Sequence, residues 1–333
     1  MPVRENVYIC AKNTYNVLNY TIIRMNSKTY NSKVRGVTPF VRMDRNKNPL
    51  SVLIIGNGFD LDLGMHTSYR DFAKSKLWPF DSPIYDKGLG YYLNQKKHTE
   101  NWFDLERELA NYALSLKETS LEDKTQIKND KEDFSVLIQK LKEFLKTEQD
   151  NLYNVEDDVA AKRVLRDLIK LPNYFIHSFN YTDISSIAKK LGISQTQSRV
   201  EYVHGALANN DIILGTGDNT GLPEEYDFLY KTSNKNYSSN NLAESLDYAQ
   251  EIIIFGHSLG ENDFDYFKPF FQKISQNVGV NYNSIENKRL ELTIYTKDEK
   301  SEIAIKRQLR KLTDNHLQGI YANCDFKIEY TKP

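Results

Sequence analysis

The sequence predicts an α/β protein with a Rossmann-like, mostly parallel sheet that helices cover on both faces. Two observations carry this prediction. Short apolar runs of strand length, suited to burial on both faces, recur along the chain. Each run ends in a polar or glycine-containing turn, and apolar residues at helical spacing follow most of these turns. The 333 residues, 40% of them apolar and 27% charged, are enough to bury the core of such a sheet.

Five apolar segments are the expected strands. In chain order they are residues 51–55, 173–179, 200–203, 251–255 and 290–295. Helical spacing follows the second, fourth and fifth of these strands, at residues 184–191, 264–274 and 301–312. Open parallel sheets bind their ligands at the carboxyl ends of the strands. The turns after the strands are therefore the first places to look for function.

The long segment between the first two strands is expected to be helical. Apolar residues repeat at helical spacing in its two halves, around 102–116 and 134–145, whereas residues 117–133 are rich in Lys, Asp and Glu and predict a solvated connection. We interpret residues 78–170 as a helical insertion that packs beside the sheet, within one α/β domain of residues 48–333.

The first 47 residues differ in charge from the rest. Residues 1–47 contain nine Lys and Arg against two acidic residues, a charge of +7, which leaves −8 for the remainder of a chain whose net charge is −1. A basic arm can bind nucleic acid, but this Asn- and Tyr-rich segment shows little periodicity, so we do not expect nucleic-acid binding. We interpret it as a basic N-terminal extension and assign it no function.

Cysteine usage and hydropathy limit the class of protein. The two cysteines, Cys10 and Cys324, form no paired motif, so neither a disulfide framework nor a zinc site is expected, and no metal is expected. The sequence contains no apolar run of membrane-spanning length and no secretory leader pattern. These features predict a cytoplasmic protein that does not interact with a membrane.

The turn after the first strand has the composition of a nucleotide-binding loop. Gly56 and Gly58 bracket Asn57, and Gly64 follows six positions later. Glycines allow a sharp turn and a close approach to a ligand, and a following helix can present N–H groups to phosphate. The spacing is longer than that of the common dinucleotide fingerprint, and Asp60 falls inside the expected loop. A simple tight connection between strand and helix is the alternative.

Two further turns carry polar residues suited to catalysis. Asn180 closes the second strand, where its carboxamide can hold a sugar hydroxyl or a water. Thr182 and Asp183 follow it, and for Thr182 capping of the next helix is the better interpretation. His204 ends the short segment 200–203, and a neutral histidine is a competent base near pH 7. A structural role for His204 is the alternative.

The turn after the fourth strand contains a literal G-x-S-x-G at Gly256-His257-Ser258-Leu259-Gly260. This motif is typical of the nucleophile elbow of α/β-hydrolases, in which Ser258 would attack an ester with Asp298 and His316 as its partners. No oxyanion motif precedes it, and little chain follows it. The alternative is ligand binding, with Gly256 permitting a tight turn and the Ser258 hydroxyl contacting a ribose or a phosphate.

Several short blocks between residues 51 and 270 resemble a known family. They are Asn57-Gly58-Phe59-Asp60 with Gly64, Thr67-Ser68-Tyr69-Arg70-Asp71-Phe72, Trp102-Phe103-Asp104-Leu105-Glu106, Ser178-Phe179-Asn180-Tyr181-Thr182, His204-Gly205, and Gly256-His257-Ser258-Leu259-Gly260 with Asp263 and Tyr266-Phe267. In these blocks, taken in order, the chain resembles the AbiH family of bacterial abortive-infection proteins, whose role is anti-phage defence. The blocks also resemble those of sirtuin-like NAD-binding domains.

The sirtuin-like resemblance implies a role for each matched residue. The implied catalytic residues are Asn180, beside the nicotinamide ribose, and His204 as general base. The implied dinucleotide-binding residues are Gly56, Asn57, Gly58, Asp60, Thr67, Gly256 and Ser258. Because a carboxylate beside diphosphate would be repulsive, Asp60 is expected at a ribose hydroxyl or at a helix cap. Glu106 is a candidate supporting residue, although helix packing is the simpler interpretation.

Departures from the resemblance narrow the expected activity. The chain has no paired cysteines for the zinc ribbon of sirtuin deacylases, which argues against acyl-peptide substrates and leaves the NAD-cleaving half of the chemistry. We therefore expect an NAD glycohydrolase that acts in abortive infection. A nucleotide-binding sensor without turnover and a serine esterase are the alternatives. An unregulated NADase would kill its host, so we expect its activity to need a trigger. Three triggers stay open: assembly of a homo-oligomer, binding of a phage protein and binding of a second ligand.

Geometry provides the last expectation. If the sheet is parallel, the turns after four of its strands lie along one edge. We expect Gly56, Asn180, His204 and Ser258 to line one cleft there, with the insertion of residues 78–170 as one wall.

Overall fold

A computed structural model of the chain describes residues 50–97, 104–118, 124–193, 199–276 and 289–331. The chain divides into two units, Met1–Arg35 and Gly36–Pro333, and every described residue belongs to the second. The basic segment 1–47, Cys10 and Trp102 lie outside the described residues.

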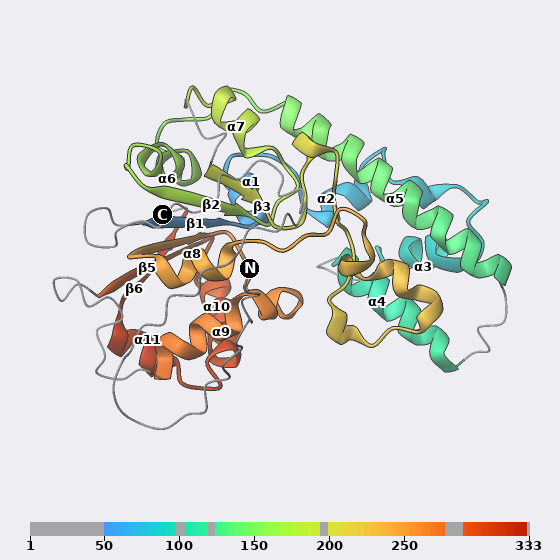
Figure 1. Cartoon of the computed structure of the whole chain (residues 1–333). Coiled ribbons are helices and arrows are strands. Elements are labelled where there is room, and N and C mark those ends of the chain that lie inside the picture. Colours follow the sequence, from blue (N-terminus) through green and yellow to red (C-terminus); the bar gives the residue numbers. More distant parts are fainter. Residues whose placement is uncertain (1–49, 98–103, 119–123, 194–198, 277–288, 332–333) are drawn as a thin grey trace, which may run out of the picture. The chain divides into compact units, whose positions relative to one another are not determined.

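Six strands of the described chain form one parallel sheet in the order β3-β2-β1-β4-β5-β6 (Figure 1). Their bounds are Ser51–Ile55 (β1), Tyr174–Ser178 (β2), Val200–Tyr202 (β3), Glu251–Phe255 (β4), Leu290–Thr296 (β5) and Cys324–Tyr330 (β6). All five residues of β1 are buried, because strands pair with it on both sides and helices cover both of its faces. The predicted parallel sheet is confirmed, and β6 is a strand that the sequence interpretation missed.

Helices cover both faces of this sheet (Figure 1). Side chains of alternating strand residues point to opposite faces, so Val52 and Ile54 pack with one helical layer while Leu53 and Ile55 pack with the other. The first layer comprises α8 (Leu242–Tyr248), α9 (Phe264–Gln276), α10 (Glu299–Leu312) and α11 (Leu317–Asn323). The second comprises α1 (Asn57–Asp62), α6 (Ala160–Leu168) and α7 (Ile184–Lys190).

A separate apolar core holds the remaining helices together. These are α2 (Tyr69–Lys74), α3 (Gly88–Lys96), α4 (Leu105–Ser115) and the long α5 (Lys124–Asp150). Two boundaries differ from the expected insertion of residues 78–170. The last part of that range, α6, packs on the sheet, whereas α2 and the later residues 212–229 contribute to the helical core.

The predicted solvated connection at residues 117–133 is wrong over its second half, because α5 begins at Lys124. Within it, Asp130 is fully buried and accepts hydrogen bonds from the hydroxyls of Tyr112 (2.7 Å) and Tyr226 (2.6 Å) and from the backbone N–H of Leu89 (2.8 Å). A charged residue that looked solvent-exposed in the sequence is therefore a buried acceptor that joins α3, α4 and α5.

Candidate active site

Four of the turns singled out in the sequence lie side by side. They follow β3, β2, β1 and β4, which are consecutive neighbours in a sheet whose strands are all parallel. His204, Asn180, Gly56 and Ser258 are thus brought to the same edge of the sheet, as expected. This shared edge does not establish the single cleft that was expected there. The side chains of Asn180 and His204 are buried, whereas Ser258 is exposed.

The glycines of the β1 and β4 turns pack directly on one another. The N–H of Gly58 donates to the carbonyl of Gly256 (2.9 Å), and the N–H of Gly56 donates to that of Phe255 (2.9 Å). A Cβ atom added at Gly58 would lie 2.5 Å from the Gly256 Cα, and one added at Gly56 would lie 2.5 Å from the His257 Cα. Contact between the two turns therefore requires these glycines, and both N–H groups are already used within the protein. A pyrophosphate at this edge would need donors other than these two.

Asn180 connects the β2 turn to the β1 turn. Its Nδ2 donates to the Gly56 carbonyl (3.1 Å) and to Asp60 Oδ1 (2.9 Å), and no described residue donates to its side-chain oxygen. Thr182 Oγ1 donates to Asp60 Oδ2 (2.9 Å). Burial raises the pKa of Asp60 to about 7, and the hydrogen bonds from Thr182 and Asn180 only partly oppose this.

Two sequence interpretations of these residues are wrong. Thr182 does not cap the next helix, because its hydroxyl bonds Asp60, and Asp183 is the N-cap of α7 through hydrogen bonds from Ser185 and Ser186. Asp60 lies inside α1 rather than in a loop, is 1% exposed, and is bound by side chains instead of capping a helix. Thr67, expected to contact a ligand, donates to Asn57 Oδ1 (2.7 Å) and so supports the start of α1.

A second polar group of five side chains, which we term the charge cluster, lies beside these turns. Its members are Glu106, His204, Lys231, His257 and Asp263. Asp263, at the end of the short helix Glu261–Asp263 that follows β4, lies between the two histidines. The distances from its carboxylate oxygens are 3.5 Å to His204 Nε2 and 3.3 Å to His257 Nε2.

The hydrogen bonds of His257 fix its tautomer. Its Nδ1 accepts the backbone N–H of Leu259 (3.0 Å), so the ring proton is on Nε2 and points to Asp263. Leu259 is fully buried and has a φ of 52°, a left-handed conformation that is uncommon for leucine. The turn after β4 therefore holds the imidazole of His257 against the carboxylate of Asp263.

Lys231 places a buried positive charge in the middle of the cluster. Its Nζ lies 3.0 Å from Glu106 Oε2, 3.8 Å from Asp263 Oδ1 and 3.4 Å from His204 Nε2. Burial is the largest single influence on the pKa of Lys231 and lowers it, but Glu106 and Asp263 together outweigh burial and raise it. The lysine therefore stays charged and donates, which requires His204 Nε2 to be an unprotonated acceptor.

The protonation of His204 follows from these contacts. Burial, followed by the Lys231 ammonium, lowers the pKa of His204 to about 3, although Asp263 opposes the shift. Burial acts to raise the pKa of Asp263, but Lys231 and the hydrogen bond from His257 together hold it below its usual range. At neutral pH the cluster thus contains a neutral histidine beside an ionised carboxylate, and the lowered pKa makes this histidine a weak proton acceptor.

Glu106 joins the helical core to this edge of the sheet. It lies on α4, and its Oε1 accepts hydrogen bonds from the hydroxyls of Tyr69 (3.3 Å) and Tyr181 (3.4 Å). Burial raises the pKa of Glu106, and the Lys231 charge offsets only part of this. The simpler interpretation of Glu106 as a helix-packing residue is therefore incomplete, because its carboxylate belongs to the charge cluster.

Sequence reasoning missed three members of the cluster. His257 was considered only as part of the G-x-S-x-G turn, and Asp263 only as part of a matched block. Both residues follow the same strand, at the edge of the sheet where His204 was expected. From this placement alone, His257 and Asp263 could have been predicted to lie near His204. Lys231 lies in an aperiodic segment, and nothing in its neighbourhood distinguishes it from an exposed lysine.

The esterase arrangement is not formed. Within the described residues no hydrogen bond joins Ser258 to His316, whose Nδ1 lies 3.2 Å from the Thr313 carbonyl before α11. Asp298 accepts the Ser301 N–H (2.8 Å) as the N-cap of α10. The residues of positive φ in the turn are Gly256 and Leu259, not Ser258, so the serine does not occupy the strained position of a nucleophile elbow.

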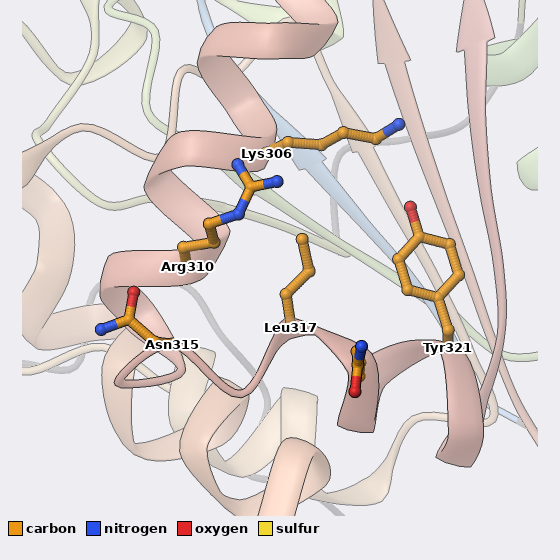
Figure 2. A pocket seen from close by; sticks show the side chains of 6 residues that line it. Lys306, Arg310, Asn315, Leu317 and Tyr321 are labelled. Atoms are coloured by element: carbon orange, nitrogen blue, oxygen red, sulfur yellow. The ribbon is translucent and has the colours of Figure 1, made fainter.

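One surface hollow of the described chain lies away from the charge cluster. A hollow of about 540 Å³ lies between α10 and α11, lined by Lys306, Arg310, Asn315, Leu317, Gln318 and Tyr321 (Figure 2). It is near the start of β6, at the opposite ends of the strands from the charge cluster. Among the described residues, no group of three or more His, Cys, Asp or Glu side chains is arranged to hold a metal ion, and none of the helices described there is both long and apolar enough to cross a membrane.

Comparison with protein families shows which family the chain resembles. The family model described as "Bacteriophage abortive infection AbiH" matches residues 52–284, which include β1 except for its first residue, all of β2 to β4 and every member of the charge cluster. No curated protein and no solved structure matches the chain.

Proposed function

Because the chain belongs to the AbiH family, whose role is bacteriophage abortive infection, we propose that its contribution to that role is to cleave NAD to nicotinamide and ADP-ribose. The observation that carries the proposal is the position of Asn180 and His204. Both follow strands on one side of the point where the strand order reverses, between β1 and β4. Sheets of the order 3-2-1-4-5-6 bind dinucleotides across the crevice at this point.

The proposed reaction is hydrolysis of the bond between nicotinamide and its ribose. A water molecule attacks the anomeric carbon, the carbon–nitrogen bond breaks, and nicotinamide leaves as a neutral molecule with the bonding electrons. His204 accepts the proton that the water loses, and Asn180 orients the water or a ribose hydroxyl with the side-chain oxygen that no described residue occupies. The ionised Asp263 stabilises positive charge on the sugar and on His204 after proton transfer.

The arrangement of Lys231 supports a resting state of low activity. An efficient general base has a pKa near the working pH, whereas burial and then Lys231 hold the pKa of His204 at about 3. Movement of Lys231 away from His204 Nε2 would raise that pKa and strengthen the base. A base weakened in this way suits an effector that must not consume NAD before infection.

The test is release of nicotinamide by the purified full-length chain, with and without lysate of phage-infected cells, measured by chromatography. We expect activity in the wild type under the activating condition and loss of about 10²-fold or more in His204→Ala and Asn180→Ala. His316→Ala, an exposed histidine away from the cluster, is the matched control and should keep full activity. Undiminished cleavage by folded His204→Ala would overturn the catalytic assignment.

Binding without turnover is the second candidate, and the low pKa of His204 is the observation that favours it. A sensor of this kind would bind NAD or a related nucleotide at the same edge and signal through the charge cluster. Calorimetric binding of NAD that is tight in the wild type, together with no nicotinamide release under any activating condition, would support the sensor over the enzyme.

A further inference from the structure

The outer strand of the sheet has one unpaired side. β6 pairs with β5, and no described strand lies beyond it. The Thr331 N–H donates to the Thr296 carbonyl on β5 (2.9 Å), so odd-numbered residues of β6 direct their backbone groups to β5. Phe326, Ile328 and Tyr330 therefore direct theirs outward, and no described residue bonds these groups. Such an edge is a template for another strand.

One end of this edge is already closed. The guanidinium of Arg289 donates to the Cys324 carbonyl (2.8 Å) and pairs with Asp325 (3.5 Å). The open part therefore begins at Phe326 and runs to the end of the strand. Tyr330 is 45% exposed on this part, and its hydroxyl donates to Glu302 of α10, where the next residue, Ile303, is 47% exposed.

The side chains of β6 restrict which strand can pair with it. Asp325, Lys327 and Glu329 are exposed on one face, while Phe326 and Ile328 pack on the other against the core beneath α10. If two copies of β6 paired antiparallel over their full length, Lys327 would face the partner's Lys327 and Asp325 would face the partner's Glu329. Like charges directly opposite one another are destabilising, so this register is disfavoured.

A shift of the pairing removes every like-charge contact. With Ile328 opposite the partner's Ile328, Lys327 faces the partner's Glu329 and Phe326 faces the partner's Tyr330. The outward backbone groups of these residues also meet, since even-numbered residues face even-numbered ones. The corresponding shift toward the start of the strand would centre on Phe326 and would need the Cys324 carbonyl, which Arg289 occupies.

We propose that β6 pairs antiparallel with β6 of a second copy of this chain, about a two-fold axis at Ile328, and so joins two sheets into one. Two Lys–Glu pairs, two aromatic pairs and one Ile–Ile pair specify the register. A hollow of about 580 Å³, lined by Asp325, Phe326 and Lys327 among others, lies on β6 itself, and Tyr321 also lines the hollow between α10 and α11 that Figure 2 shows. No described strand covers this edge, and the pairing does not depend on the reaction proposed above.

Charge exchange tests the register directly. Mass measured by light scattering across a dilution series should show a wild-type dimer. Lys327→Glu and Glu329→Lys should each weaken dimerisation about 10- to 100-fold, because two attractive pairs become repulsive. The double exchange, Lys327→Glu with Glu329→Lys, should restore wild-type dimerisation. A wild-type monomer, or a dimer unaffected by the single exchanges, would overturn the proposal.

A cysteine at the two-fold axis provides a second test that does not rely on charge. Directly opposite residues of this kind lie about 5.5 Å apart at Cα, within the span of a disulfide. In a Cys10→Ser background, Ile328→Cys should form a covalent dimer on mild oxidation. Ile84→Cys, at a position 77% exposed on the helical core, is the control and should stay monomeric on denaturing gels. Equal cross-linking of the two variants would overturn the pairing at Ile328, and protection of β6 amides from hydrogen exchange in a monomer would overturn it by showing that another segment covers the edge.

Discussion

Replacing Lys231 with methionine removes the ammonium that lies between Glu106 and Asp263. Its distance of 3.0 Å from Glu106 corresponds to a gross attraction of about 5 kcal/mol at an effective dielectric constant near 20. Desolvation of the ammonium offsets much of this, and removal of one partner from a buried pair typically costs about 3–5 kcal/mol. We expect Lys231→Met to lower the free energy of unfolding by that amount.

The assay is urea denaturation at about pH 5.5 and about pH 8. Without Lys231, the pKa of Glu106 rises further above its unfolded value, because burial then acts unopposed by that charge. Stabilisation by protonated Glu106 is present at low pH and is lost as the pH rises through the folded-state pKa. The variant should therefore be less destabilised at the lower pH. Adding Glu106→Gln should recover much of the stability lost at the higher pH.

Lys235→Met, on an exposed lysine four residues along the chain, is the matched control and should change stability little. The reasoning is refuted if Lys231→Met costs no more than this control, or if its cost does not depend on pH. A nuclear magnetic resonance titration gives an independent measurement. The pKa of His204 should rise in the variant, since the Lys231 charge is the largest influence on it after burial.

Three further predictions concern the buried polar groups and the turn contact. Burial raises the pKa of Asp60 to about 7, so the stabilisation that protonated Asp60 provides is lost as the pH rises through that value. The wild type should therefore lose about 3 kcal/mol of unfolding free energy between about pH 5 and about pH 8 in denaturant titrations. Asp60→Asn should not show this loss. Asp130→Ala should lower the free energy of unfolding by about 3 kcal/mol or more in the same assay, because buried hydroxyl and N–H donors lose their acceptor. Glu132→Ala, on an exposed side chain, should leave the free energy of unfolding nearly unchanged. Gly58→Ala should lower the melting temperature by an amount equivalent to about 2 kcal/mol, because its Cβ would lie 2.5 Å from the Gly256 Cα.

Each of these has a contradicting outcome. Parallel pH profiles of the wild type and Asp60→Asn would show that Asp60 does not change its protonation in the folded state. Equal effects of Asp130→Ala and Glu132→Ala would show that the buried acceptor contributes nothing net. Gly217→Ala is the comparison for Gly58, since its added Cβ would have only one neighbour, at 3.8 Å, and a Gly58→Ala variant as stable as Gly217→Ala would reject the contact argument.

Apolar runs made the sheet predictable from the sequence. The bounds of β1 and β4 agree with prediction, because uninterrupted apolar runs with turn residues at their ends have few other structures available. β6 was missed although Asp325, Lys327 and Glu329 alternate with apolar residues, the period of an edge strand. Alternation over so few residues is a weaker signal than a continuous run.

The charge cluster was only partly predictable for a different reason. The local sequence around His204 and Asn180 marks them as polar residues at strand ends, and the parallel sheet then places both at one edge. Burial of Lys231, in contrast, is favourable only because Glu106 and Asp263 surround it, and those contacts depend on distant parts of the chain. Thr182 was misassigned likewise, since its partner Asp60 precedes it by well over a hundred residues.

The separation of the cluster residues along the chain has a kinetic consequence. Glu106 comes from the helical core, His204 and Lys231 from segments after β3, and Asp263 from the segment after β4, so closing the cluster requires several long loops to be ordered first. Contacts between residues so far apart form slowly. During synthesis, a nascent chain has no Asp263 until β4 and the turn after it have been made, so the charge cluster cannot close before that point.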